Sequence, residues 1–273
     1  MNDPAMLLAL ASLFGLLIGS FLNACIYRLP RRISVVAPRS FCPRCNASIA
    51  WYDNIPLLSF CLLRGRCRHC RRPIPLRYPV NEMLTALLFC VVLYRWGIAL
   101  ESFKWAVFCC LIVALFWTDL ETRLLPDVLT LGGIVAALLF ALGVPMRNLL
   151  VDIFLPQLDP AFSSALAALT SAVLLSLPFL LFSEAYASIR KITPVGWGDI
   201  KLLALLGAFL GLQRGLFALI VGSAGGAIIG LSYIWATGKS AKTEPLPYGS
   251  FLCAGGLIAL FWGPELFSRW WSL

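Results

Sequence analysis

The chain has 273 residues, of which 60% are hydrophobic and only 13% are charged, and its formal net charge is +9. This composition excludes a water-soluble domain of this length, because so few charged side chains cannot cover its surface. We therefore expect an all-α protein that crosses a membrane several times.

The apolar segments predict about eight membrane-spanning helices, since one crossing of the bilayer needs about 20 mostly apolar residues. The expected spans are residues 5–26, 79–96, 103–120, 126–143, 163–184, 201–212, 215–236 and 247–263, of which 201–212 is short. We interpret the first as a retained span rather than a signal peptide, because its leading segment carries Asp3 and no Lys or Arg.

Between the first two spans lies a polar insert, residues 28–78. From Arg28 to Arg77 it holds eleven Arg, one His and a single acidic residue, Asp53. Basic residues concentrate on the cytoplasmic side of membrane proteins, so we place the insert there and both termini outside. With the inner loops, including Lys239 and Lys242, this side then carries 17 of the 22 basic residues. The charge favours contact with anionic lipid head groups over nucleic acid.

Two cysteine pairs in the insert predict a metal site. Cys42-Pro-Arg-Cys45 is followed after 21 residues by Cys67-Arg-His-Cys70. Four thiolates at this spacing suit tetrahedral Zn²⁺, whose binding would supply the folding free energy that a short, charged insert lacks. Disulfides are the alternative, but a cytoplasmic location disfavours them. His69 lies inside the second pair, and the four cysteines satisfy the metal without it.

Two aspartates stand at the ends of apolar runs. Asp119 closes one run, and Asp199 directly precedes another. A carboxylate facing lipid at mid-bilayer costs roughly 2.5–3.5 kcal/mol, so both acids suggest a function at the cytoplasmic edge. Each could also be an ordinary helix-end residue, and Asp127, after Pro126, could be either a cap or an assistant to the pair.

Paired carboxyl groups that share one proton can act together as base and acid in peptide hydrolysis. Gly196 and Gly198 would leave room for a substrate backbone beside Asp199 and would permit backbone angles closed to larger residues. Two alternatives stay open. One is a proton-coupled transporter that uses Asp119, Asp199 and Glu82 as a relay, and the other is a non-catalytic zinc-knuckle adaptor.

The sequence resembles the type IV prepilin peptidases, bifunctional leader peptidases and N-methyltransferases of the GxGD aspartyl protease class. The stretches that carry the resemblance are residues 15–30, 51–60, 77–89, 118–131, 196–207 and 247–255, together with the cysteine pairs. They occur in the order of the family and cover nearly every predicted cytoplasmic segment.

The resemblance implies that Asp119 and Asp199 are the catalytic pair and that Gly196 and Gly198 belong to the GxGD signature. It also implies zinc held by Cys42, Cys45, Cys67 and Cys70. The substrates would be prepilin and pseudopilin precursors of type IV pili and type II secretion. An enzyme of the bacterial inner membrane would cut them at the cytoplasmic face and methylate the new amino group with S-adenosylmethionine.

The resemblance divides the chain into a first helix, residues 1–27, the zinc-binding insert, residues 28–78, and a peptidase domain, residues 79–273. Residues 1–90 would be associated with methyl transfer. The lack of a glycine-rich loop after a strand disfavours a Rossmann-type donor site. The candidate contacts to the methyl donor are instead Asn23, Tyr27, Arg28, Asp53, Asn54 and Glu82, and the alternative role of Glu82 is a salt bridge to Arg77 or Arg28.

Overall fold

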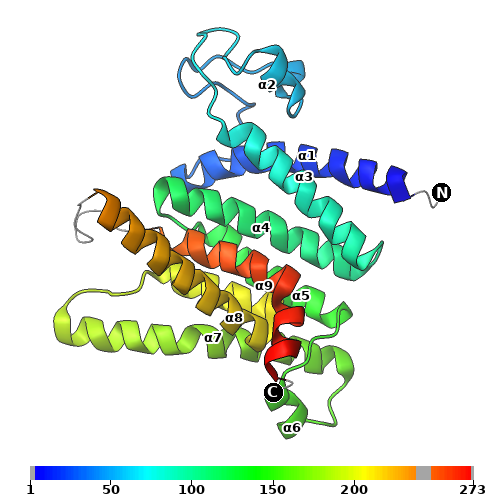
Figure 1. Cartoon of the computed structure of the whole chain (residues 1–273), viewed down its shortest axis with the longest axis vertical. Helices are drawn as coiled ribbons and strands as arrows, with labels where there is room; N and C mark the ends of the chain where they lie inside the picture. Colours follow the sequence, from blue (N-terminus) through cyan, green and yellow to red (C-terminus); the bar gives the residue numbers. More distant parts are fainter. Residues whose placement is uncertain (1–3, 238–246, 272–273) are drawn as a thin grey trace. The chain divides into compact units, whose positions relative to one another are not determined.

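The computed structural model describes residues 4–237 and 247–271, and these residues form helices and no strand, which confirms the all-α class. Lys239 and Lys242 lie outside the described residues. The helices are α1 (Pro4–Arg28), α2 (Leu58–Leu62), α3 (Arg77–Trp96), α4 (Leu100–Thr122), α5 (Asp127–Gly143), α6 (Leu149–Phe154), α7 (Pro160–Arg190), α8 (Trp197–Thr237) and α9 (Tyr248–Trp271) (Figure 1). Two short 3-10 helices, Leu29–Arg31 and Trp51–Asn54, lie in the insert.

Four helical segments in the described part of the chain are long and apolar enough to cross a membrane. They are Pro4–Arg31, Leu100–Thr122, Pro160–Arg190 and Trp197–Ala236, and Asp127–Gly143 and Tyr248–Gly263 are shorter apolar helices. The membrane character is therefore supported, whereas the number of eight spans stays a prediction.

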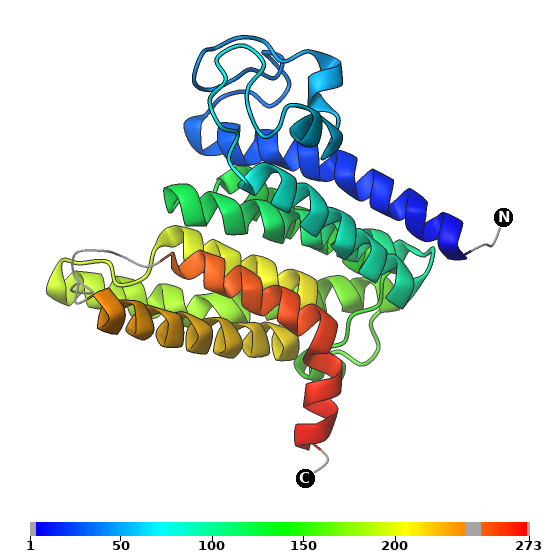
Figure 2. The ribbon, with the colours of Figure 1, turned by 45° about the horizontal axis from the view of Figure 1, so that its top comes forward.

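Helix α8 consists of two arms that meet at Gly211, whose φ of 79° and ψ of 173° are not helical. A Cβ on Gly215 would lie 3.6 Å from the Cα of Gly207, although residues eight apart in a continuous helix are separated by about 12 Å. The chain therefore turns back at Gly211, and in Figure 2 the yellow arm and the orange-brown arm run roughly parallel, with the orange-red helix α9 drawn between them. This reversal agrees with the separate apolar segments 201–212 and 215–236 of the sequence.

The chain divides into two compact units, residues 1–114 and 115–273. In the first unit α1 packs closely on α3 through two glycines one helical turn apart. A Cβ on Gly15 would lie 2.6 Å from the Cα of Ala86, and one on Gly19 would lie 2.8 Å from the Cα of Glu82. Small residues at this spacing let membrane helices approach until their backbones touch.

In the second unit small residues likewise set the helix contacts. A Cβ on Gly207 would lie 2.5 Å from the carbonyl oxygen of Ser171 on α7, and one on Gly222 would lie 2.8 Å from that of Phe251 on α9. The first arm of α8 is buried on all sides, as Leu202, Leu203, Leu205 and Leu206 are fully inaccessible. This buried arm begins at Asp199 and so gives that residue a rigid support.

Candidate active site

Asp119 lies in the last turn of α4 and is 5% exposed. Its Oδ2 atom accepts two hydrogen bonds from Ser250 at the start of α9, one from the backbone N–H at 2.6 Å and one from the hydroxyl at 2.9 Å. The same hydroxyl lies 3.1 Å from the carbonyl oxygen of Phe116. The first turn of α9 therefore holds the carboxyl group of Asp119 directly.

Asp199 lies in the first turn of α8, and its backbone N–H donates to the carbonyl of Gly196 at 3.1 Å. Its carboxyl group interacts electrostatically with that of Asp119 and with Tyr248. The buried thiol of Cys253 interacts with both aspartates. The structure thus brings together the two acids that the sequence predicts, and it adds a third element, α9, beside them.

Leu125, in the loop between α4 and α5, lies between the two glycine-containing turns of this site. A Cβ on Gly198 would lie 3.1 Å from the Cβ of Leu125, and one on Gly249 would lie 3.1 Å from its Cδ1. A Cβ on Gly249 would also lie 3.1 Å from the Cγ of Asp119. A side chain at either position would press on Leu125 or on the carboxyl group of Asp119, which would have to give way by a few tenths of an ångström.

The expectation that Gly196 and Gly198 adopt backbone angles closed to larger residues is wrong. The glycines with positive φ in the described residues are Gly65, Gly97 and Gly211. At Gly198 the constraint is space, and at Gly196 a Cβ would lie 3.3 Å from the Oδ2 of Asp199.

Asp127, in the first turn of α5, accepts a hydrogen bond from Nζ of Lys201 at 2.6 Å. It is not the N-cap of α5, a position that Pro126 occupies, so the simple capping role is wrong. Its side chain is 62% exposed, and an ion pair in such a place contributes about 0–1 kcal/mol. The pair ties the start of α5 to the start of α8, two residues after Asp199.

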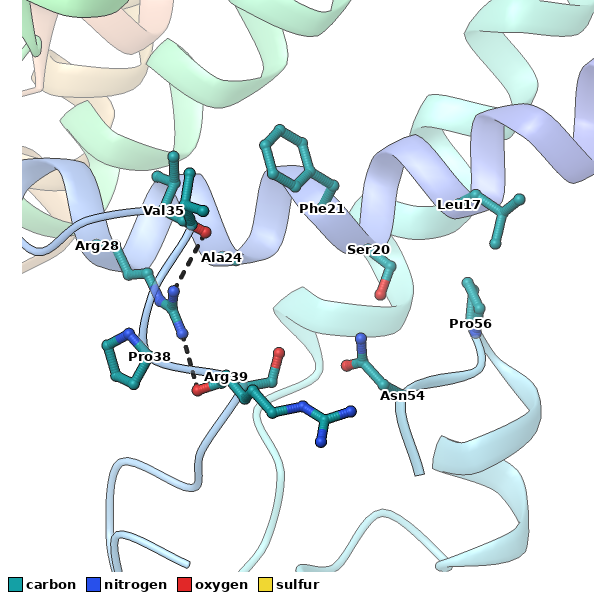
Figure 3. Close-up of a pocket in the computed structure, with 12 residues that line it drawn as sticks. Leu17, Ser20, Phe21, Ala24, Arg28, Val35, Pro38, Arg39, Asn54 and Pro56 are labelled. Atoms are coloured by element: carbon teal, nitrogen blue, oxygen red, sulfur yellow. Dashed lines mark hydrogen bonds between the residues drawn. The ribbon is translucent and has the colours of Figure 1, made fainter. Parts of the chain in front are cut away.

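The candidate contacts for the methyl donor are distributed differently from the sequence-based expectation. A pocket of about 360 Å³ lies between the C-terminal half of α1 and the loops of the insert, and Arg28 and Asn54 are the two candidates that line it (Figure 3). Arg28 donates to the carbonyls of Ser34, Val35 and Arg39 at 3.0–3.3 Å, so it shapes the wall of the pocket.

Asn23 and Tyr27 are held by neighbours within the first unit. Asn23 is buried, donates to the carbonyl of Tyr78 at 3.1 Å and accepts from Asn81, which joins α1 to α3. The ring of Tyr27 packs edge-on against Phe41 and lies 4.2 Å from the guanidinium of Arg31.

Glu82 and Asp53 do not line the pocket, although Glu82 is hydrogen-bonded to Ser20, which does. The Oε2 atom of Glu82 accepts the backbone N–H of Leu57 at 2.8 Å. Arg68 donates two hydrogen bonds to Asp53, at 2.6 and 2.7 Å, and holds the pKa of that carboxyl below its usual range. Arg39 and Ser20, which the sequence argument did not single out, line the pocket instead.

The four cysteines of the two pairs converge in the insert. Their Sγ atoms lie within 4.8 Å of one another, and all four are free thiols. Tetrahedral Zn²⁺ with Zn–S bonds of about 2.3 Å separates its sulfurs by about 3.8 Å, so the cluster fits this ion. Hydrogen bonds from the backbone N–H groups of Cys70 and His69 and from the neighbouring thiols lower the pKa of the Cys67 thiol to about 7, whereas burial and the neighbouring thiols raise the pKa of the Cys45 thiol to about 11, because the thiols of the cluster share their protons.

An all-helical membrane protein with two neighbouring carboxyl groups and a four-cysteine cluster belongs to a narrow class, and comparisons with known proteins identify the family. Residues 13–96 match the bacterial peptidase A24 N-terminal domain, and residues 106–231 match the type IV leader peptidase family. The chain therefore belongs to the type IV leader peptidase family.

Curated relatives match the chain over nearly its full length. The prepilin leader peptidase/N-methyltransferase of Legionella pneumophila is 35% identical, with 97% of this chain and 94% of the relative covered. The protein of the same name from Aeromonas salmonicida (strain A449) is 37% identical, with 98% and 94% covered. That from Burkholderia pseudomallei (strain 1026b) is 34% identical, with 96% and 87% covered. No solved structure matches the chain.

Proposed function

We propose that this protein removes the leader peptide from type IV prepilins and pseudopilins and N-methylates the new terminal residue with S-adenosylmethionine as donor. The names of its relatives support both activities. The single observation that carries the peptidase assignment is that the carboxyl groups of Asp119 and Asp199 lie close enough to interact electrostatically, with Asp119 held by the first turn of α9.

The two carboxyl groups are suited to activate water without a nucleophilic side chain. One ionised carboxylate takes a proton from water as the water oxygen attacks the peptide carbonyl, while the other, protonated group donates to the carbonyl oxygen. The C–N bond breaks when the first group returns its proton to the amide nitrogen. The names of the relatives do not support the transporter alternative. That alternative uses Glu82 as a proton relay, whereas the Glu82 carboxyl group accepts the backbone N–H of Leu57 within the first unit.

We place both aspartates at the cytoplasmic face of the bacterial inner membrane, in a chain with eight spans. The eight spans would be α1, α3, α4, α5, α7, the two arms of α8, and α9. In this arrangement Asp119, at the end of α4, and Asp199, at the start of α8, lie on the same side as the arginine-rich insert, as the bias of basic residues favours. The insert would face anionic lipid head groups.

The pocket beside α1 is the best place for the methyl donor. Its volume lies in the range of about 300–1,000 Å³ that small-ligand sites occupy. The side chains of Arg39, Asn54 and Ser20 offer polar contacts for an amino-acid moiety, and Leu17, Phe21 and Pro56 form apolar walls. S-adenosylmethionine supplies an activated methyl group when bound. Binding of this donor, measured by calorimetry, should weaken in Arg39→Ala and persist in Arg72→Ala, which alters an exposed arginine outside the pocket.

Zinc would have a structural role, with Cys42, Cys45, Cys67 and Cys70 as its ligands. The insert of residues 28–78, with α1 and α3, would form the part associated with methyl transfer. The helices after residue 114 would form the peptidase part, which contains both aspartates. We place α3 with the first part because it packs on α1 within one compact unit.

The direct test incubates the purified enzyme with a precursor pilin, with and without S-adenosylmethionine, and reads the mass of the product N-terminus. We expect cleavage in both cases and a mass increase of one methyl group only with the donor. Asp119→Asn and Asp199→Asn should each lower the rate of leader cleavage by at least about 1,000-fold. Both variants should still bind zinc and should still methylate pre-cleaved pilin. Normal cleavage by purified Asp199→Asn would refute the assignment.

A further inference from the structure

We propose that Ser250 is a positioning residue for leader cleavage, which fixes the carboxylate of Asp119 and thereby makes Asp119 the base and Asp199 the acid. The proposal rests on the peptidase function proposed above. It assigns a role to a residue at the start of α9, and it gives the two aspartates different roles in the reaction.

Ser250 holds one particular oxygen of the Asp119 carboxyl group by hydrogen bonds. Oδ2 of Asp119 receives both the backbone N–H and the hydroxyl of Ser250, at 2.6 and 2.9 Å. Both side chains are buried, since Asp119 is 5% and Ser250 is 3% exposed. Two donors on one oxygen fix the rotation of the carboxyl group and leave Oδ1 as the atom that can meet water.

The hydroxyl of Ser250 does not cap its own helix. Its hydrogen-bond partners are Asp119 and the carbonyl of Phe116, both in the last turns of α4. A serine in the first turn of a helix more commonly bonds to backbone groups of that helix. The contact therefore joins α4 to α9 at the carboxyl group itself.

The surroundings of Asp199 differ. No hydrogen bond to its carboxyl group is found among the residues that the structure describes, and the nearby hydroxyl of Tyr248 is hydrogen-bonded to Ser223 at 2.8 Å. Hydrogen bonds from N–H and O–H donors favour the ionised form of a carboxyl group. When the pair shares one proton, that proton therefore resides on Asp199.

This assignment gives a balanced sequence of proton transfers. Asp119 takes a proton from water as the water oxygen bonds to the carbonyl carbon. Asp199 gives its proton to the carbonyl oxygen, and the product of these two transfers is a gem-diol. Asp119 then passes its proton to the amide nitrogen as the C–N bond breaks, and a diol hydroxyl returns a proton to Asp199. Both groups end in their starting states.

The test compares three variants in steady-state cleavage of a precursor pilin. Ser250→Ala removes the hydroxyl and keeps the backbone donor, so kcat should fall about 10- to 100-fold, the range expected for one hydrogen bond to a charged group, with little change in KM. Ser250→Thr keeps a hydroxyl and should recover most of the lost kcat. Ser164→Ala is the control, because this serine is also buried and its Oγ is also hydrogen-bonded to another segment, here as the acceptor of the backbone N–H of Met146 at 3.1 Å.

Methylation of pre-cleaved pilin by Ser250→Ala provides the second readout and should equal that of the wild type. The proposal is overturned if Ser250→Ala cleaves with normal kcat, if only KM changes, or if methylation falls in parallel with cleavage. It is also overturned if Ser164→Ala loses as much kcat as Ser250→Ala. Failure of the wild-type enzyme to cleave at all would instead refute the proposed function.

Discussion

Leu125 shows how single residues define the candidate site. Its side chain packs against the positions of Gly198 on α8 and Gly249 on α9, so three segments distant in sequence meet around one leucine. A methyl group on either glycine would lie 3.1 Å from Leu125, so this side chain would have to shift by a few tenths of an ångström. The two glycines thus matter because they lack a side chain: Leu125 can pack closely against both turns, and the carboxyl group of Asp119 can lie beside Gly249.

Gly249→Ala should disturb catalysis through Asp119. The new Cβ would lie 3.1 Å from both Cγ and Oδ2 of Asp119, and a displacement of about 1 Å in a catalytic group costs about 100-fold in rate. We expect kcat for leader cleavage to fall by at least about tenfold. Gly132→Ala on α5 is the control, because its Cβ would meet nothing within 4 Å, and it should leave kcat unchanged. Equal activity of the two variants would contradict this account.

The sequence alone singled out the two aspartates and the four cysteines, because each aspartate stands at the end of an apolar run and the cysteines form two CxxC pairs. The structure confirms that the cysteines converge, and the catalytic role of the aspartates stays a prediction. It could not assign Ser250 or Leu125, since the hydrogen bond between Ser250 and Asp119 spans 131 positions. The stretch 247–255 carried the family resemblance but no chemistry of its own. Of the six candidates for the donor site, Arg28 and Asn54 line the pocket, because a polar residue near a helix end is as often used for packing as for binding.

At the scale of elements, α8 is the feature that places Asp199. The separation of apolar segments 201–212 and 215–236 anticipated two arms, since together they exceed one bilayer crossing. Which residue makes the turn could not be read from the sequence, because Gly207, Gly211 and Gly215 all lie in this region. Only Gly211 has the required backbone angles, whereas the other two serve close packing.

Gly211→Ala should lower stability without a direct clash. Its φ of 79° and ψ of 173° lie in a region that is nearly restricted to glycine, and its Cβ would approach the sulfur of Met146 no closer than 3.7 Å. We expect a loss of about 1–3 kcal/mol in the free energy of unfolding. Thermal unfolding in detergent measures this loss, with Gly132→Ala as the helical reference. An unchanged midpoint would mean that the arms reverse without strain at this residue.

At the scale of the whole molecule, the excess of positive charge and the four-cysteine cluster both belong to one insert. The insert has short 3-10 turns and one five-residue helix, so little regular structure supports it. The binding free energy of structural zinc, about 10–16 kcal/mol in zinc-finger peptides, is large enough to replace a core. The composition of the insert predicts that its folding depends on zinc. The arrangement of the polar side chains around the four cysteines could be seen only in the structure.

Cys42→Ser with Cys67→Ser should remove zinc and the order of the insert together. The exposed Cys61, in α2 of the same insert but outside the cluster, provides the matched control as Cys61→Ser. We expect metal analysis to find about one zinc per chain in the control and none in the double variant, with faster proteolysis of the insert. An insert that resists protease equally in both proteins would rule out the structural role.

The hydrogen bonds from Ser250 to Asp119 also bear on biosynthesis. A ribosome makes Asp119 long before Ser250, so a nascent chain carries both acids while one of them still lacks its donors. On the proposed role of Ser250, full hydrolytic activity therefore requires that α9 has been translated and has packed against the end of α4.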